Sequence, residues 1–215
     1  MFFEVFIRVF AENIELKHPE WRKELNFANS GFFRTFAQHY LKIMNYKENL
    51  KNIKAFVFDY DGVISDGKVW VVDERDQVRN SSVKDGYALH HAVKKGYRIA
   101  IISGGKGDSM RIRLNNVGVT DVFQGIRNKM EVFEQYCSDN NIDPKTVLYM
   151  GDDIPDYIVM QNVGIATCPA DAVPEIKEIS HYISHQKGGE GCVRDVIEQV
   201  LKVHGDWMGD DAVIW

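Results

Sequence analysis

The chain is poor in cysteine, in net charge and in long hydrophobic runs, and each shortage excludes a class of protein. Three cysteines occur in 215 residues without a Cys-X-X-Cys pair, so neither a disulfide framework nor a zinc site is indicated. No segment approaches the ~18 apolar residues of a membrane span. The formal net charge of -5 gives no electrostatic reason to expect nucleic acid or an anionic membrane as a partner. A cytoplasmic location with reduced thiols fits these features, and the amino terminus lacks the basic start of a signal peptide.

The composition changes near Met44. Before this residue, aromatic and charged side chains mix without a sustained period, whereas strand-like and helix-like segments alternate regularly from Ile53 onward. We therefore expect a poorly ordered or loosely packed extension over residues 1–43, a main domain over 44–205 and a short tail over 206–215.

The main domain is predicted to be an α/β fold with a doubly wound parallel sheet. Apolar runs predict strands at Ala55–Phe58, Tyr97–Ile102, Asp121–Phe123, Val147–Met150 and Gly164–Thr167. Helices are predicted after Asp85, taken as an N-cap, and over Asp108–Asn116, Lys129–Asn140, Pro155–Asn162 and Gly191–Val203. Such alternation implies right-handed crossovers between parallel strands. Alternating residues over 68–79 predict a short β-hairpin.

The most informative feature is an apolar strand that runs directly into two carboxylates and a glycine, Asp59, Asp61 and Gly62. Alternation along a strand places Asp59 and Asp61 on the same side, and ligands bind at the carboxyl edge of parallel strands. Two carboxylates this close require a cation, and oxygen ligands together with a substrate phosphate suit Mg²⁺. Taken alone, the same residues also fit an ordinary Asp-Gly turn.

Three further polar features follow predicted strands. Ser103 and Gly104 could let backbone N–H groups approach a phosphate. Lys129 begins a helix, where a cation opposes the helix dipole unless it has an anionic partner. Asp152 and Asp153 could complete a metal site. Each feature alone is also explained as a turn, a solvated lysine or a helix cap, but their occurrence after successive strands argues against coincidence.

This ordered set resembles the haloacid dehalogenase superfamily of aspartate-nucleophile phosphatases, over about Lys54 to Gly205. The resemblance implies that Asp59 attacks phosphorus and becomes an aspartyl phosphate. It also implies that Asp61 protonates the leaving alcohol and then activates water.

The same resemblance implies the remaining site residues. Mg²⁺ would be held by the Asp59 carboxylate, the Asp61 backbone carbonyl and Asp152, with Asp153 in support. Ser103 and Lys129 would neutralise the phosphoryl oxygens.

Four motifs make the chain similar to the 3-deoxy-D-manno-octulosonate 8-phosphate phosphatases: Asp59–Val63, Val83–Tyr87, Gly151–Asp153 and Gly188–Arg194. This closer resemblance implies a homotetramer in which neighbouring subunits close each other's sites, because the hairpin leaves no room for a cap domain. The substrate contacts that it implies are Asp61, Ser82, Val83, Lys84, Asp85, Gly86, Gly104, Arg113 and Lys129. The chain departs from these phosphatases at His90 and Gly105, where arginine is often found, which bears on how a sugar acid's carboxylate would be held.

We therefore predict a Mg²⁺-dependent phosphatase that converts 3-deoxy-D-manno-octulosonate 8-phosphate to the free sugar acid and phosphate, a step towards lipopolysaccharide. The nearest alternative acts on a nine-carbon ulosonate 9-phosphate of the sialic acid type. A receiver domain in signalling uses similar groups, but its phosphorylated aspartate follows a mid-chain strand, and here that strand ends in Ser103-Gly104. A non-catalytic subunit is disfavoured because Asp59, Asp61, Lys129 and Asp152 are all present.

Overall fold

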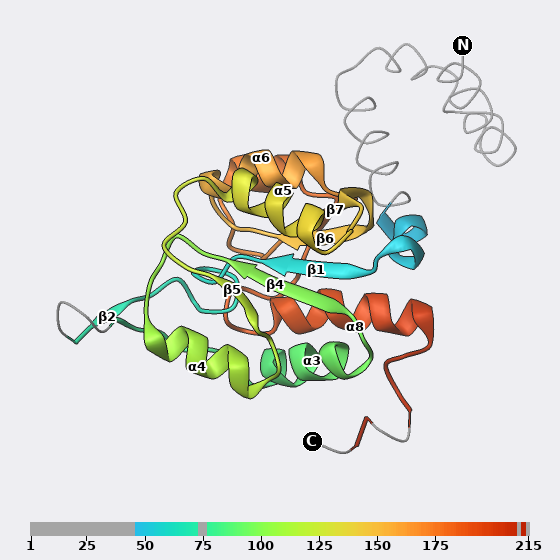
Figure 1. Cartoon of the computed structure of the whole chain (residues 1–215), viewed down its shortest axis with the longest axis horizontal. Coiled ribbons are helices and arrows are strands. Elements are labelled where there is room, and N and C mark those ends of the chain that lie inside the picture. Colours follow the sequence, from blue (N-terminus) through green and yellow to red (C-terminus); the bar gives the residue numbers. More distant parts are fainter. Residues whose placement is uncertain (1–45, 73–76, 210–211, 214–215) are drawn as a thin grey trace, which may run out of the picture. The chain divides into compact units, whose positions relative to one another are not determined.

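The structure is a computed structural model that describes residues 46–72, 77–209 and 212–213 (Figure 1). The extension predicted over residues 1–43 lies outside the described residues, as do residues 73–76 between the two strands of the hairpin.

A six-stranded parallel sheet forms the centre of the domain. Its strands are β1 (Ala55–Phe58), β4 (Arg98–Ile102), β5 (Asp121–Phe123), β6 (Val147–Met150), β7 (Ile165–Cys168) and β8 (Tyr182–Ile183). The strand order is β5-β4-β1-β6-β7-β8, so the chain builds one half of the sheet outward from β1 and then crosses over to build the other half. Phe58 at the end of β1 is in register with Ile101 of β4 and Met150 of β6. The residues that follow these strands therefore converge at a topological switch point, where ligands bind in such sheets.

Helices cover both faces of the sheet (Figure 1). One face carries α3 (Val83–Lys94), α4 (Asp108–Asn116) and α8 (Cys192–His204), and the other carries α5 (Lys129–Asp139), α6 (Tyr157–Asn162) and α7 (Pro174–Ile179). Phe56 and Phe58 of β1 belong to the first core, whereas Ala55 and Val57 belong to the second. The uninterrupted apolar run of β1 is thus explained by burial on both faces.

The fold class and the principal elements agree with the sequence-based prediction, and β1, β5 and β6 have the predicted bounds. The N-cap predicted at Asp85 is wrong: α3 begins at Val83, and the Ser82 hydroxyl accepts a hydrogen bond from the Asp85 N–H at 3.4 Å. The helix predicted at Pro155 is a short 3₁₀ turn, η5 (Ile154–Asp156), followed by α6. The short elements α7 and β8 were not among the predicted ones.

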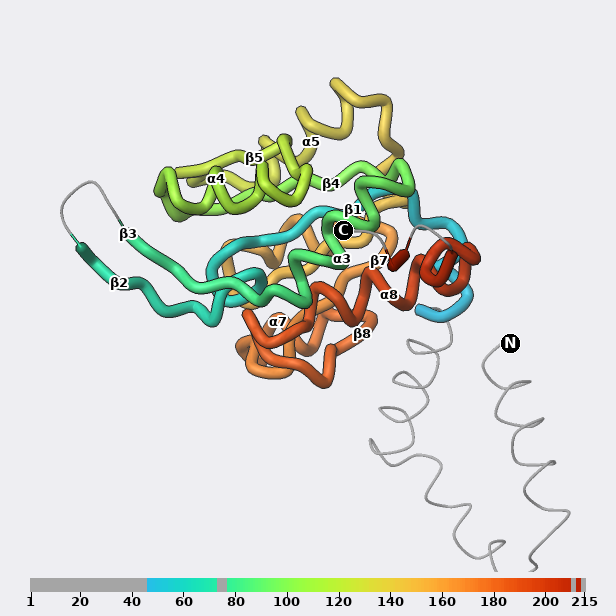
Figure 2. Tube along the Cα trace, turned by 90° about the horizontal axis from the view of Figure 1, so that it is seen from below, coloured from blue at the N-terminus to red at the C-terminus, as the bar shows by residue number. Residues whose placement is uncertain are grey.

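A second, two-stranded sheet is the predicted hairpin. Strands β2 (Trp70–Val71) and β3 (Gln77–Val78) pair antiparallel, with Trp70 opposite Val78. Figure 2 shows that they project away from the main sheet and its helices. Trp70 is 73% exposed and Val71 is 72% exposed, so strand β2 leaves apolar side chains open to solvent.

The described part of the chain contains no helix with both the length and the apolar character needed to cross a bilayer. Cys137, Cys168 and Cys192 are buried free thiols.

Candidate active site

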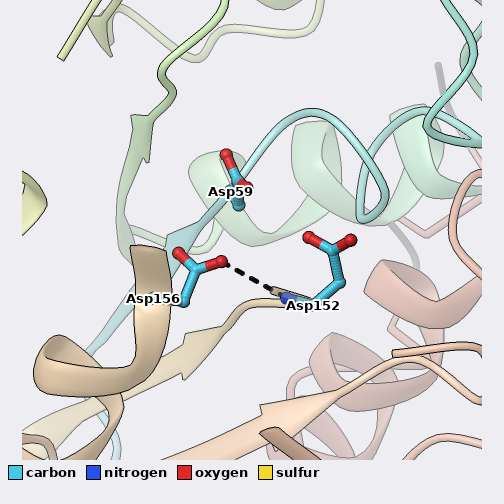
Figure 3. A group of neighbouring side chains, drawn as sticks. All are labelled: Asp59, Asp152 and Asp156. Carbon is cyan, nitrogen blue, oxygen red and sulfur yellow. Dashed lines mark hydrogen bonds between the residues drawn. The ribbon is translucent and has the colours of Figure 1, made fainter. Parts of the chain in front are cut away.

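Three carboxylates converge at the carboxyl edge of the sheet (Figure 3). Asp59 directly follows β1, Asp152 follows β6, and Asp156 ends the 3₁₀ turn η5. One oxygen from each of the three lies within 4.8 Å of the others. The Asp59 N–H donates to the carbonyl of Met150 at 3.0 Å, so a backbone hydrogen bond fixes the loop after β1 to the end of β6.

The acidic group has the properties of a cation site. Asp152 Oδ1 is buried and has no hydrogen-bond partner among the described residues, an arrangement that is costly unless another group satisfies this oxygen. The loop after β1 approaches so closely that a Cβ added at Gly62 would overlap the Asp152 carboxylate, and Gly62 has φ +85°. Only glycine adopts this backbone without strain. The donors are all oxygens, so the site fits Mg²⁺.

The pKa values of these carboxyl groups reflect their crowding. Burial, followed by the charge of Asp156, raises the pKa of Asp59 to about 7. Burial, followed by the charges of Asp59 and Asp156, raises the pKa of Asp152 to about 8. A bound divalent cation would oppose both effects, because it stabilises the ionised form of each group.

Lys129 is the cation that the protein itself supplies to this cluster. It is the first residue of α5, is only 5% exposed, and its Nζ lies 2.8 Å from Asp59 Oδ2 and 2.7 Å from Asp156 Oδ1. Burial lowers the pKa of Lys129, but the charges of Asp59 and Asp156 outweigh burial and raise it. The expectation that a lysine at a helix start has an anionic partner is therefore met by two carboxylates.

Asp156 is a site residue that sequence reasoning missed. Its Oδ1 accepts hydrogen bonds from Lys129 Nζ and, at 2.5 Å, from the hydroxyl of the fully buried Tyr149. Its Oδ2 accepts one from the Asp152 N–H at 3.3 Å (Figure 3). The side chain therefore orients both Lys129 and the backbone at Asp152. The signal in the sequence was the continuation of the acidic run from Asp152 to Asp156.

Asp153 does not join the three carboxylates. Its side chain accepts a hydrogen bond from the Ile154 N–H at 2.8 Å and caps η5, and the residue is exposed. The supporting metal role predicted for Asp153 therefore stays a prediction, and the capped turn ends at Asp156, which is part of the acidic cluster.

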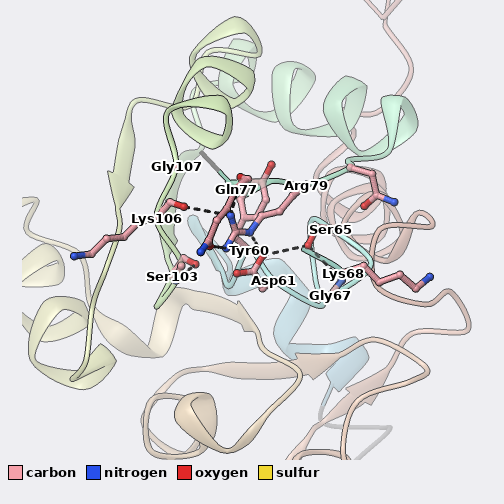
Figure 4. Close-up of polar contacts among 12 residues, drawn as sticks. Tyr60, Asp61, Ser65, Gly67, Lys68, Gln77, Arg79, Ser103, Lys106 and Gly107 are labelled. Atoms are coloured by element: carbon pink, nitrogen blue, oxygen red, sulfur yellow. Dashed lines mark hydrogen bonds and ion pairs between the residues drawn. The ribbon is translucent and has the colours of Figure 1, made fainter. Parts of the chain in front are cut away.

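Asp61 lies next to Arg79 and Ser65 (Figure 4). Its Oδ1 accepts a hydrogen bond from Arg79 Nε at 2.5 Å and a longer one from the Ser65 hydroxyl at 3.4 Å. Arg79 directly follows β3, so the base of the hairpin contacts Asp61 within one chain. This residue was absent from the sequence-based site, because nothing local in the sequence links it to Asp61.

Ser103 follows β4 and is fully buried. Its backbone N–H donates to Phe123 at 2.9 Å, and its hydroxyl accepts from the Gly105 N–H at 3.0 Å. Gly104 is exposed, and a Cβ added there would make only an ordinary contact, 3.6 Å from the Ile126 carbonyl oxygen. The role predicted for Ser103 as a phosphate-neutralising hydroxyl stays a prediction.

The predicted substrate segment forms the start of α3. Val83 and Lys84 are exposed, whereas Ser82 is half-buried and caps the helix. A Cβ at Gly86 would overlap the guanidinium of Arg113, so glycine lets this arginine lie across the first turn.

Asp85 differs from its neighbours in α3, because it is 1% exposed. Its Oδ1 accepts the Arg194 N–H at 2.7 Å, and burial raises its pKa to about 6. The structure thus gives the Asp85 carboxylate a partner at the start of α8, and the substrate contact expected for Asp85 stays a prediction.

A glycine-rich loop at residues 188–191 packs against the loop that follows β1. The Gly189 N–H donates to the Val63 carbonyl at 2.9 Å. A Cβ at Gly188 would overlap the carbonyl oxygen of Gly62. The backbone of this loop therefore lies directly against the backbone that carries Asp59 and Asp61.

Comparison with known proteins agrees with this geometry. A family model described as haloacid dehalogenase-like hydrolase matches residues 3–170, so the match begins earlier than the motifs had indicated. The chain is 33% identical to 3-deoxy-D-manno-octulosonate 8-phosphate phosphatase from Yersinia pestis over 150 residues, which cover 70% of this chain and 80% of the relative. It is 34% identical to the protein of the same name from Escherichia coli K12 over 155 residues, 72% of this chain and 82% of the relative.

Solved structures with the same name are similar over most of the chain. The phosphatase from Yersinia pestis superposes with a TM-score of 0.73 at 30% identity and covers 75% of this chain and 88% of its own. The phosphatase from Moraxella catarrhalis, in complex with magnesium ion, phosphate ion and a KDO molecule, has a TM-score of 0.70 at 29% identity and covers 73% of this chain and 90% of its own.

Proposed function

The chain belongs to the haloacid dehalogenase-like hydrolases, and from this premise we propose that it is a Mg²⁺-dependent phosphatase of 3-deoxy-D-manno-octulosonate 8-phosphate. The observation that carries the proposal is the buried Asp59 carboxylate, which pairs with Lys129 and lies beside the acidic residues Asp152 and Asp156. A carboxylate fixed beside a cation and a metal-binding group is suited to in-line attack on a phosphoryl group.

The proposed reaction has two steps. In the first, an oxygen of Asp59 attacks phosphorus, the bond from phosphorus to the sugar oxygen breaks, and Asp61 gives its proton to that oxygen. In the second, Asp61 takes a proton from water as the water oxygen attacks phosphorus, and the bond to Asp59 breaks. Phosphate leaves, and both aspartates return to their starting states.

Residues of this chain hold the reacting groups throughout. Lys129 favours the ionised form of Asp59 against the effect of burial and opposes charge on the phosphoryl oxygens. Asp59, Asp152 and the Asp61 backbone carbonyl would hold Mg²⁺, whose positive charge supplies further stabilisation to the phosphoryl oxygens. Asp156 acts differently, because its oxygens already accept hydrogen bonds from Lys129, Tyr149 and the Asp152 N–H. It positions these groups.

The proposed substrate follows from the names of the similar proteins and not from a binding pocket in this structure. The similar proteins are named for the eight-carbon sugar acid phosphate, and one of them was solved with KDO and phosphate. The test is phosphate release across a panel of ulosonate phosphates. Preference for the eight-carbon ester by kcat/KM supports the proposal, and preference for another ester contradicts it.

We further propose that the chain works as a homotetramer in the cytoplasm. The hairpin exposes a run of apolar side chains, with Val69 40%, Trp70 73% and Val72 66% exposed. Such a patch on a subunit surface is typical of an interface. Light scattering should give a tetramer. An active monomer would contradict the assembly while leaving the reaction class intact.

A further inference from the structure

Among the described residues, the carboxylate of Asp61 is held through one of its two oxygens. Both hydrogen bonds that the structure gives this group end on Oδ1: one from Arg79 Nε at 2.5 Å and one from the Ser65 hydroxyl at 3.4 Å (Figure 4). An oxygen that accepts a hydrogen bond from a guanidinium carries negative charge and is a poor place for a proton. When Asp61 is protonated, the proton therefore belongs on Oδ2.

Arg79 is itself fixed, so that it can orient Asp61. Its side chain is only 4% exposed although it comes from the hairpin. Nη1 donates to the Gln77 carbonyl at 3.1 Å and to the Lys106 carbonyl at 3.2 Å, and Nη2 donates to Gln77 Oε1 at 3.4 Å. The planar guanidinium thus spans β3, the loop after β4 and the loop after β1, which leaves it little freedom to rotate.

Gly105 leaves the other side of the carboxylate open. A Cβ added at this position would lie 2.5 Å from Asp61 Oδ2, 2.7 Å from Arg79 Nη2 and 3.3 Å from the Ser103 hydroxyl oxygen. Gly105 is not among the glycines with positive φ, so its backbone does not require glycine. A side chain at position 105 would instead displace the Asp61 carboxylate or the Arg79 guanidinium from the positions that they occupy here.

We propose that Arg79 and Gly105 together make Oδ2 the oxygen through which Asp61 exchanges its proton with the substrate. Arg79 is a positioning residue that occupies Oδ1, and Gly105 is the opening through which the sugar oxygen, and later the attacking water, reach Oδ2. In the first step the proton moves from Oδ2 to the leaving oxygen. In the second step it moves from water to Oδ2. This inference rests on the acid and base roles proposed above for Asp61.

The test uses two esters that differ in their need for an acid. A sugar alkoxide must be protonated as it leaves, whereas p-nitrophenolate leaves without a proton. The rate of alcohol release in the first turnover, measured by rapid mixing with Mg²⁺, isolates this step. For Arg79→Ala we expect this rate to fall by roughly 10- to 100-fold with the sugar phosphate. This is part of the roughly 10²- to 10⁴-fold acceleration that acid catalysis supplies. With p-nitrophenyl phosphate we expect the parent rate within about threefold.

Companion variants separate the possible outcomes. Gly105→Ala should reproduce the same selective loss, and the double variant should be no worse than Arg79→Ala alone, because both changes disturb one arrangement. Arg111→Ala, an exposed arginine on α4, should behave as the parent. Retention of the thermal shift produced by Mg²⁺ verifies that each variant is folded.

An equal loss with both esters, or no loss with either, would overturn the inference. Asp61→Asn distinguishes that failure from a failure of the proposed function. If Asp61→Asn is selective for the sugar ester and Arg79→Ala is not, the inference alone is wrong. If the parent protein releases no phosphate from either ester, the proposed function is wrong.

Discussion

Lys129 Nζ lies 2.8 Å from Asp59 Oδ2, so the carboxylate proposed as nucleophile has its counter-ion inside the protein. The two groups come from different elements: Asp59 directly follows β1 and its side chain is 11% exposed, and Lys129 begins α5 and its side chain is 5% exposed. Shielding from water strengthens the electrostatic effect of such a pair. The arrangement makes Lys129 a fixed charge that needs no reorganisation when a phosphoryl group binds.

Replacement of Lys129 by Met should therefore lower kcat by about 100- to 1,000-fold, the usual cost of removing one preorganised charge stabiliser. Asp59→Asn should abolish turnover altogether, because the amide cannot form the aspartyl phosphate. Lys145→Met, on the exposed turn before β6, is the matched control and should keep the parent rate. Phosphate release under saturating substrate measures all three. Turnover by Asp59→Asn at more than a few per cent of the parent would exclude the covalent route.

A pair of neighbouring substitutions distinguishes the two acidic residues that follow Asp152. Asp156→Asn removes the charge that holds Lys129 Nζ at 2.7 Å, and we expect kcat to fall by about 100-fold. Asp153→Asn changes an exposed cap of a 3₁₀ turn and should cost less than about 1 kcal/mol of stability with little change in kcat. Steady-state kinetics and thermal unfolding of both variants check this. A larger kinetic loss for Asp153→Asn would restore Asp153 to the site.

The strands and the convergence of Asp59, Lys129 and Asp152 could be predicted because they depend on local signals. A short apolar run bounded by turns marks a buried strand, and the ends of neighbouring parallel strands meet at one edge. The elements α7 and β8 are six and two residues long, too short to show a period.

The missed residues depend on geometry that no local pattern contains. Asp156 faces the site only because Asp153 caps a 3₁₀ turn that contains Pro155. Arg79 and Asp61 are 18 residues apart in sequence and meet only when the hairpin lies against the loop after β1. Asp85 was predicted to cap α3, but the structure buries it against the start of α8.

The hydroxyl of Tyr149 contributes to stability through a charged partner. It donates to Asp156 Oδ1 at 2.5 Å in the fully buried core. Tyr149→Phe should lower the free energy of unfolding by about 1.5–3 kcal/mol, the range for hydrogen bonds to charged groups. Tyr46→Phe is the matched comparison, because the buried Tyr46 donates to the neutral Gln199 side chain at 3.1 Å. Tyr46→Phe should lower the free energy of unfolding by only about 0.5–1.5 kcal/mol, and chemical denaturation measures both variants. Equal costs would show that the charge of Asp156 adds nothing to this bond.

The raised pKa values of Asp59 and Asp152, about 7 and about 8, make both stability and metal binding depend on pH. Without metal, the native state binds more protons than the unfolded state between about pH 4, near the unfolded pKa, and the two native values. The unfolding free energy contributed by these groups therefore falls as pH rises through this window. Below about pH 4 both carboxyl groups are protonated in the native and the unfolded state, so the free energy of unfolding no longer changes with pH through these groups.

Mg²⁺ should reverse this loss, because it binds the ionised carboxylates and displaces their protons. We expect the increase in melting temperature at a fixed Mg²⁺ concentration to be larger at pH 8 than at pH 6. Calorimetric titration in two buffers of different ionisation enthalpy should show proton release that shrinks as pH rises above 8.

Asp152→Asn removes one ligand and one titrating group, so both the thermal shift and its pH dependence should largely disappear. Asp85, whose pKa is about 6, is the control site, since Asp85→Asn should change the stability without metal but leave the Mg²⁺ shift in place. A Mg²⁺ shift equal at pH 6 and pH 8 would mean that Asp59 and Asp152 are already ionised before the metal binds, and that Lys129 alone overcomes their burial.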